Sequence, residues 1–358
     1  MGEDVKRHWL FGAAALLLPP APALADHPAA AGISSGPASL NVLSPQTLDR
    51  GALSAGFRLT YARPERRSDE ELETLAGQHI HAHAGDYVLL GSAGLGYGLS
   101  DRLTLSAELP LIRRGDIREG AHSHSGGQAH NDVVNRGGVS GIGDISLLAR
   151  FRLTGGDADA PALALIGGVK APTGSTNRRD GDGERFETEH QPGSGSWDFI
   201  SGAAFGAPLG ALRLDASAVY HHSGTGAQRT RLGDRFHGGI ALSHRFGPAA
   251  DHHEAPADHH HDGCGGDHHH DDAPPPHGHR SWDVFVELTG EYEGRQRIAG
   301  AVEAESGGTA VFLSPGVRFN AASGFSVAAG IGIPVWQDIR LSHPDNSYRL
   351  TLSIGRAF

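Results

Sequence analysis

The sequence predicts an all-β protein, specifically a transmembrane antiparallel up-and-down β-barrel of about 12 strands. Two observations support this. Apolar residues recur at every second position, as in Leu103-Thr-Leu-Ser-Ala-Glu-Leu109, which is the period of a β-strand with one apolar face. The 358 residues also include 52 Gly, and Gly- and Asp-rich turns interrupt every helical pattern.

The first 25 residues are expected to be a signal peptide. Two basic residues precede an apolar run, and Ala23-Leu24-Ala25 is a cleavage site of the A-x-A type. A short anchor or a buried helix is the alternative, but the run is too short and too interrupted by Pro to span a bilayer. Residues 26–50 should then form a periplasmic segment, and residues 51–358 the barrel.

An even number of strands is the rule in bacterial outer-membrane barrels. The predicted strands are 51–61, 86–98, 103–112, 141–154, 161–172, 196–207, 212–222, 236–246, 282–293, 309–319, 325–335 and 347–358. A soluble β-sandwich or β-barrel, with its apolar face turned inward, is the alternative. Charges of both signs on the polar face favour a barrel in which this face lines a water-filled lumen and the apolar face contacts outer-membrane lipid. These charged residues include Arg58, Glu108, Arg150, Lys170, Asp215, Glu287 and Arg349.

The last strand ends in Phe358, which resembles the signal that the barrel insertion machinery reads. Connection lengths alternate between short and long, and outer-membrane barrels keep short turns on the periplasmic side. The long connections are 62–85, 113–140, 173–195, 223–235, 294–308 and 336–346. Residues 247–281 break this rule, because a long, His-rich insertion stands where a short periplasmic turn belongs.

The insertion carries the strongest chemical signal. Residues 251–280 hold ten His and seven Asp or Glu around Cys264. Imidazole suits Zn, Ni, Co and Cu, and nearby carboxylates add negative charge and oxygen ligands. The alternative is an acidic, solvated insertion with incidental metal affinity. The predicted ligands are His252, His253, His259, His260, His261, His268, His269, His270, His277 and His279.

Two outer loops add spaced histidines. In an extended chain, residues at i, i+2 and i+4 lie on one side, so their imidazoles could converge on one metal ion. A polar loop without a metal role is the alternative. The predicted ligands are His79, His81 and His83 in the first loop, and His122, His124 and His130 in the second.

Composition and missing motifs exclude several classes of function. A net charge of −11 with only two Lys excludes nucleic acid as a favourable partner. The single Cys excludes an intramolecular disulfide and a Cys-cluster metal site. The chain has no Gly-x-Ser-x-Gly, HExxH or P-loop motif, so we expect no enzyme and no required cofactor.

Four segments resemble the outer-membrane family labelled "putative MetA-pathway of phenol degradation". They are Ser140-Gly-Ile-Gly-Asp144-Ile-Ser-Leu-Leu-Ala-Arg-Phe-Arg152, Lys170-Ala-Pro-Thr-Gly174, Gly193-Ser-Gly-Ser-Trp-Asp198 and Leu313-Ser-Pro-Gly-Val-Arg-Phe319. The resemblance spans about 50 to 358 and implies a monomeric barrel with a small-molecule conduit. It supplies no catalytic residues. The His-rich segments depart from the family pattern and resemble those of metal-associated members.

These observations together indicate a channel or transporter-like protein of the bacterial cell outer membrane for small solutes, linked to divalent transition-metal handling. The outer-loop histidines would capture the metal ion, and the 252–279 tract would receive or buffer it. Two alternatives stay open. One is a passive channel for aromatic or other small organic compounds, and the other is a non-transporting periplasmic metal sink.

The position of the insertion can be tested at Cys264. By loop parity, residues 247–281 should be reached from the periplasm, so a membrane-impermeant thiol label should miss Cys264 in intact cells. Opening the outer membrane should expose it. Removing 251–280 should abolish most metal binding and leave the barrel folded, because a Pro- and Gly-rich acidic tract buries little surface. Labelling of Cys264 in intact cells would show that the insertion faces the outside of the cell. An unchanged metal stoichiometry after the deletion would show that the tract is a solvated insertion without a metal role.

Overall fold

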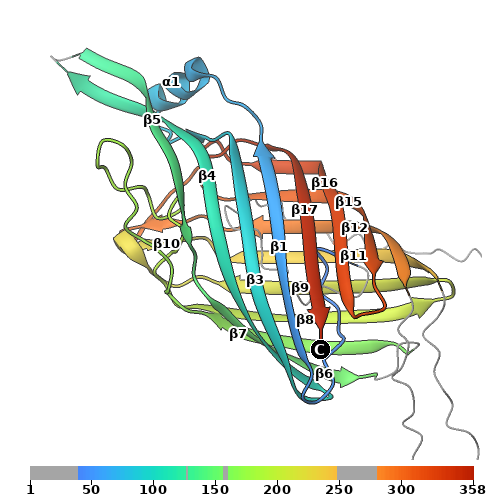
Figure 1. Cartoon of the computed structure of the whole chain (residues 1–358). Coiled ribbons are helices and arrows are strands. Elements are labelled where there is room, and N and C mark those ends of the chain that lie inside the picture. The colour runs from blue at the N-terminus through green and yellow to red at the C-terminus, as the bar shows by residue number, and fades with distance from the viewer. Residues whose placement is uncertain (1–38, 126–127, 156–159, 248–279) are drawn as a thin grey trace, which may run out of the picture.

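The computed structural model describes residues 39–125, 128–155, 160–247 and 280–358. Within them, 12 antiparallel strands form a closed ring (Figure 1). In ring order the strands are β1 (Leu53–Pro64), β3 (Tyr87–Ser100), β4 (Leu103–Ser125), β6 (Ser146–Thr154), β7 (Ala162–Lys170), β8 (Asp198–Leu209), β9 (Leu212–His222), β11 (Arg235–Phe246), β12 (Ser281–Glu293), β15 (Gly308–Asn320), β16 (Phe325–Ile339) and β17 (Asn346–Ala357). Pairing of β17 with β1 joins the last strand to the first, so the predicted barrel is confirmed.

The remaining elements lie in the long connections. β4 runs beyond the ring and pairs with β5 (Gln128–Ile142), which leads through a short break into β6. The other elements are α1 (Asp69–Gly77), β2 (His83–Ala84), the 3-10 helix η1 (Ala227–Arg229), β10 (Thr230–Arg231), β13 (Arg297–Ile298) and β14 (Ala301–Val302). No helix in the described ranges has both the length and the apolar character needed to cross a membrane.

Strand β12 shows how the two faces differ. Trp282, Val284 and Leu288 are 42–53% exposed on the outside of the ring. The alternate residues Asp283 and Glu287 are 1% and 0% exposed and face the lumen. A soluble β-protein would reverse this pattern, because its apolar face would be the buried one. The inside-out alternation is the pattern of a membrane barrel.

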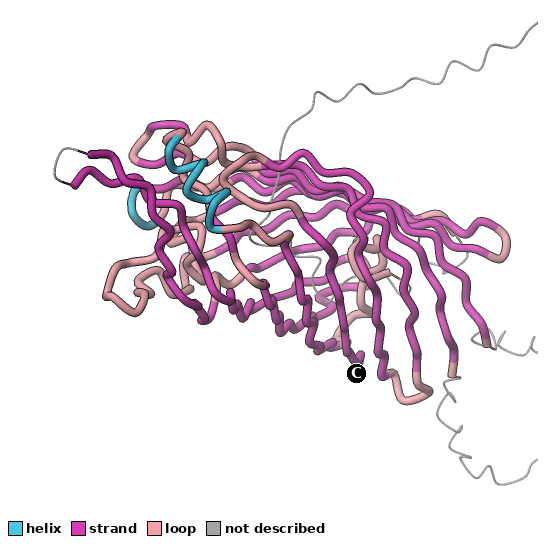
Figure 2. The backbone as a smooth tube through the Cα atoms, turned by 90° about the horizontal axis from the view of Figure 1, so that it is seen from above, coloured by secondary structure: helices cyan, strands magenta, loops and turns pink. Residues whose placement is uncertain are grey.

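The two ends of the barrel are unlike. Helix α1 and the longer loops gather at one end, which we call the long-loop end, and the C-terminus lies at the other, the short-turn end (Figures 1 and 2). Strand β11 ends and β12 begins at the short-turn end, so the flanks of the insertion lie there, as loop parity predicts. The insertion itself, 248–279, and the predicted signal peptide lie outside the described residues.

Four of the expected loops contain regular structure, and in two of them this structure packs together. Residues 62–85 include α1, which Ser68 caps by accepting a hydrogen bond from the Glu71 amide (3.1 Å). Residues 113–140 form most of the β4–β5 hairpin. The helix packs Leu72 and Leu75 against a small apolar cluster that includes Val133 of the hairpin, and this contact stabilises both.

The lipid-facing register predicts a difference between neighbouring residues. Replacing Leu352, which is 54% exposed on the outer face, with Arg should cost about 2–4 kcal/mol of folding free energy. Thr351→Arg should cost much less, because Thr351 lines a lumen cavity of about 480 Å³. Leu147→Arg and Ser146→Arg form the same comparison on β6. Denaturant titration of the barrel in lipid vesicles measures both pairs, and equal losses would contradict the register.

Candidate functional site

Most of the N-terminal segment, residues 39–50, lies inside the barrel, and only Asp49 and Arg50 at its end are exposed. The Glu287 carboxylate accepts hydrogen bonds from the backbone amides of Leu40 (2.7 Å) and Asn41 (2.9 Å) and from the Asn41 side chain (2.5 Å). Arg58 donates to the Asn41 side-chain oxygen (2.5 Å) and to the Leu40 carbonyl. Residues 39–45 therefore differ from the periplasmic segment expected at 26–50, of which 26–38 lie outside the described residues.

Apolar side chains of the N-terminal segment fill part of the lumen. Leu40 packs with Phe285 and Ala328, and Leu43 packs with Ile166 and Ala204 on the far side of the ring. Each side chain removes apolar surface from water, which stabilises the segment in place. Nearer the short-turn end, the Leu48 amide donates to the Thr104 hydroxyl (2.8 Å), and Arg150 donates to the Gln46 carbonyl (3.0 Å). The segment thus narrows the lumen along its length.

Part of the inner loop, residues 171–197 between β7 and β8, also folds into the lumen, whereas residues 177–179 and 181–185 are exposed. The Asp144 carboxylate accepts hydrogen bonds from the backbone amides of Gly174 and Ser194, both at 2.8 Å. Lys170 lies between the carboxylates of Asp144 (3.0 Å) and Asp198 (2.8 Å). A Cβ atom on Gly193 would lie 2.7 Å from the Gly174 backbone, so only glycine allows the two chain segments to pack this closely.

A cavity of about 850 Å³ lies in the lumen beside the inner loop. Its wall contains both apolar and charged side chains, including Leu90, Ile112, Ile200, Glu108, Lys170 and Arg235. Most ligand sites for small organic molecules combine an apolar wall with a few polar groups in this way. The cavity can therefore receive a small solute that has both an apolar and a polar part.

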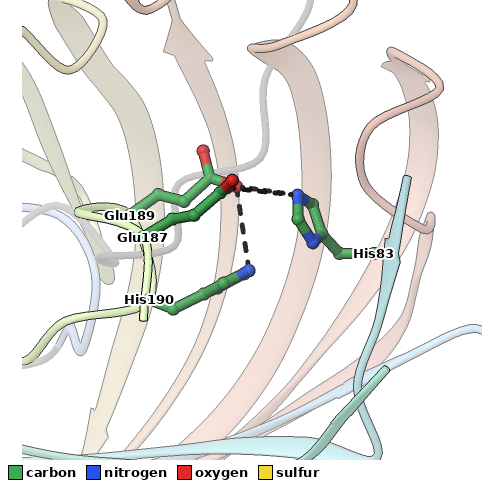
Figure 3. Close-up of side chains that lie close together, drawn as sticks. All are labelled: His83, Glu187, Glu189 and His190. Carbon is green, nitrogen blue, oxygen red and sulfur yellow. Dashed lines mark ion pairs between the residues drawn. The ribbon is translucent and has the colours of Figure 1, made fainter. Parts of the chain in front are cut away.

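At the long-loop end, a His/Glu cluster joins two elements: His83 from β2, and Glu187, Glu189 and His190 from the inner loop (Figure 3). The Nε2 atom of His83 lies 3.3 Å from Glu189 Oε1 and 3.6 Å from Glu187 Oε2. The Nε2 atom of His190 lies 3.8 Å from Glu189 Oε1.

A second cavity, of about 690 Å³, adjoins this cluster. His83, His190 and His343 line it together with Tyr87 and Arg349. His343, from the connection between β16 and β17, lies with its ring centroid 5.9 Å from that of His83. The cluster therefore borders the space through which a solute would approach the lumen from the long-loop end.

The two histidines of the cluster differ in charge. Burial disfavours protonation of His83, but the Glu119 carboxylate 3.6 Å from Nδ1 and the carboxylates of Glu189 and Glu187 outweigh burial and raise the His83 pKa to about 9. Burial lowers the His190 pKa well below its usual value, and the charge of His83 lowers it further. At neutral pH His83 is therefore a cation within a group of carboxylates, and His190 is neutral.

The structure separates most of the predicted loop ligands. His79 has a φ of 60° directly after α1, so the chain is not extended there and the expected one-sided array of His79, His81 and His83 does not form. His81 is exposed, whereas His83 is buried. The His79 ring packs edge-on against His122 instead, with centroids 4.7 Å apart. His130 is exposed on β5. The His124 side chain and the histidines of 252–279 lie outside the described residues.

Sequence reasoning missed Glu187, Glu189 and His190. They lie in the predicted long loop 173–195, and their contact with His83 joins positions about a hundred residues apart, which no local pattern records. The one local signal is Glu187-Thr-Glu189-His190, where metal-binding residue types stand close together. His83 was predicted to bind metal together with His79 and His81 of its own loop, whereas its neighbours in the structure are carboxylates of another loop.

Comparison with solved structures places the fold among outer-membrane proteins. The chain is similar to an outer membrane channel from Pseudomonas putida F1, with a TM-score of 0.52, 18% identity, and coverage of 89% of this chain and 100% of that one. A weaker similarity, with a TM-score of 0.38 and 12% identity, relates it to LpxR from Salmonella typhimurium, covering 84% of this chain and 99% of that one. No curated protein matches the sequence.

The sequence also matches a protein family over much of its length. Residues 66–267, more than half of the chain, match the family described as "Putative MetA-pathway of phenol degradation". The match covers three of the four segments that carry the resemblance in the sequence, and the fold is that of a bacterial outer-membrane β-barrel. This match over more than half of the chain shows that the protein belongs to that family.

Proposed function

We propose that this protein is a passive outer-membrane channel for small organic compounds that have an apolar body and one polar or charged group, aromatic compounds included. The observation that carries the proposal is the 850 Å³ lumen cavity, whose wall combines Leu90, Ile112 and Ile200 with charged side chains. A purely hydrated ion would gain nothing from the apolar part of this wall. The family description, which refers to phenol degradation, supports the same class of solute.

The arrangement of the ion pairs favours this alternative over metal transport, which the histidines had suggested. Among the described residues, the group of His and carboxylate side chains close enough to share a metal ion lies at the long-loop end. In the 850 Å³ cavity, Lys170 is already paired with Asp144 and Asp198. Such a wall offers fixed dipoles and paired charges to a solute rather than a series of free ligands for a metal ion.

The two occupants of the lumen would set the size of what passes. The N-terminal segment narrows the short-turn side and the inner loop narrows the long-loop side, with the cavity beside them. Both are held by hydrogen bonds from backbone amides to lumen carboxylates, each worth about 1.5–3 kcal/mol. A solute can therefore pass only where these side chains and segments leave space or move aside.

Filling the cavity should block the channel. Ser92 points into it from β3, so Ser92→Trp should lower the uptake of radiolabelled benzoate into proteoliposomes several-fold. Ala93→Trp is the matched control, because Ala93 is exposed on the outer face and a Trp there meets lipid. A change in uptake that is the same for both variants would count against the cavity as the conduit.

Releasing the N-terminal segment should widen the channel. Glu287→Gln removes the charge that holds the amides of Leu40 and Asn41, so single-channel conductance in planar bilayers should rise and fluctuate more. Glu291→Gln is the control, since Glu291 faces the lumen from the same strand and pairs with Arg349 instead. If the conductance of Glu287→Gln stays at the wild-type value, the segment does not limit flow.

A further inference from the structure

We infer that the His/Glu cluster binds one divalent first-row transition-metal ion, for which Zn²⁺ is the probe, and that the bound ion clamps the inner loop to β2. The site lies at the long-loop end, beside the cavity through which a solute would approach the lumen, and the inference does not depend on which solute the channel carries. Its ligands would be His83, Glu187, Glu189 and His190, and His83 would release its proton to solvent when the ion binds.

The donor set and its spacing fit such an ion. One donor atom from each of the four residues lies within 4.8 Å of the others. Two imidazoles and two carboxylates are ligands that Zn²⁺ takes readily, at about 2.0–2.2 Å each, which places neighbouring donor atoms roughly 3.4 Å apart. The distances of 3.3, 3.6 and 3.8 Å between the donor atoms of Figure 3 are close to that spacing.

The His190 side chain is an independent sign of a missing ligand. It is 5% exposed, and neither of its ring nitrogens has a hydrogen-bond partner within the part of the chain that the structure describes. Buried polar atoms in proteins almost always have a partner, because burial without one costs free energy. A metal ion at Nε2, on the side of Glu189, would supply that partner.

Groups behind the ligands are placed as they are around protein metal ions. Glu119 lies 3.6 Å from His83 Nδ1, which is longer than a hydrogen bond, on the side of the ring away from the other ligands, and Arg136 holds Glu119 through a 2.8 Å ion pair. Gln296 donates to Glu189 Oε2 (2.5 Å), and so leaves Oε1 directed at the histidines. Outer contacts such as the Gln296–Glu189 hydrogen bond orient the ligands of protein metal ions.

The restraint of the inner loop by the bound ion can be measured at three trypsin cleavage sites in that loop. The inner loop carries Arg178, Arg179 and Arg185, all exposed and thus open to trypsin whenever the loop moves away from the barrel. An ion that joins Glu187, Glu189 and His190 to His83 would restrain this movement. Metal bound by the insertion at the short-turn end would not, because that segment is attached at the opposite end of the barrel.

The test is limited trypsin digestion of the full-length protein in detergent, stripped with a chelator and titrated with Zn²⁺. Cleavage at Arg178, Arg179 and Arg185, read by mass spectrometry, should fall as a single site fills, and Mg²⁺ should not replace Zn²⁺ because imidazole is a poor ligand for Mg²⁺. His83→Ala and Glu189→Gln should each raise the Zn²⁺ concentration needed by at least about tenfold. His81→Ala, two residues away and exposed, should behave as wild type.

Retention of heat-modifiable migration on gels shows which variants still fold. A Zn²⁺-soaked crystal of the wild-type protein gives a second measurement that needs no variant, and an anomalous peak between His83 Nε2 and Glu189 Oε1 is expected. Absence of that peak, absence of Zn²⁺ protection in the wild type, or equal protection in His83→Ala would each overturn the inference. The cluster would then be an ion-pair group held by protonated His83.

Discussion

The structure depends on one constraint: hydrocarbon offers no hydrogen-bond partner to a backbone N–H or C=O group. A sheet that crosses the membrane must therefore close, and here β1 with β17, and β4 with β6, complete the ring. Closure turns the usual arrangement of a β-protein inside out, because the outer surface meets lipid. The polar residues of each strand are then collected in a narrow lumen.

A narrow polar lumen sets a second requirement, since buried charges are stable only with partners. Two buried carboxylates find their partners in the same way, by accepting hydrogen bonds from backbone amides. Glu287 accepts hydrogen bonds from backbone amides of the N-terminal segment, and Asp144 accepts them from backbone amides of the inner loop. Three of the four segments that carry the family resemblance meet around Asp144, at Lys170, Gly174 and Gly193. The residue types in these three segments therefore allow the inner loop to pack inside the lumen.

The barrel could be predicted from the sequence because its information is local. Within each strand, apolar and polar residues alternate with a period of two, so one face is apolar and the other polar, as in β12. The lumen contents and the His/Glu cluster could not be predicted, because they depend on contacts between distant positions such as Leu40 with Glu287 or His83 with Glu189. Helix α1 could have been predicted, since Ser68 and Glu71 form a local capping pattern at its start.

The position of the N-terminal segment also constrains how the barrel is assembled. The segment continues directly into β1, and β1 with β17 forms the seam between the two ends of the barrel sequence. Either the seam closes around a chain that already lies within the ring, or the segment enters through the short-turn end afterwards. In the first case Glu287 and Arg58 would organise the unfinished sheet from within, and the segment would act as an internal template for the curvature of the strands.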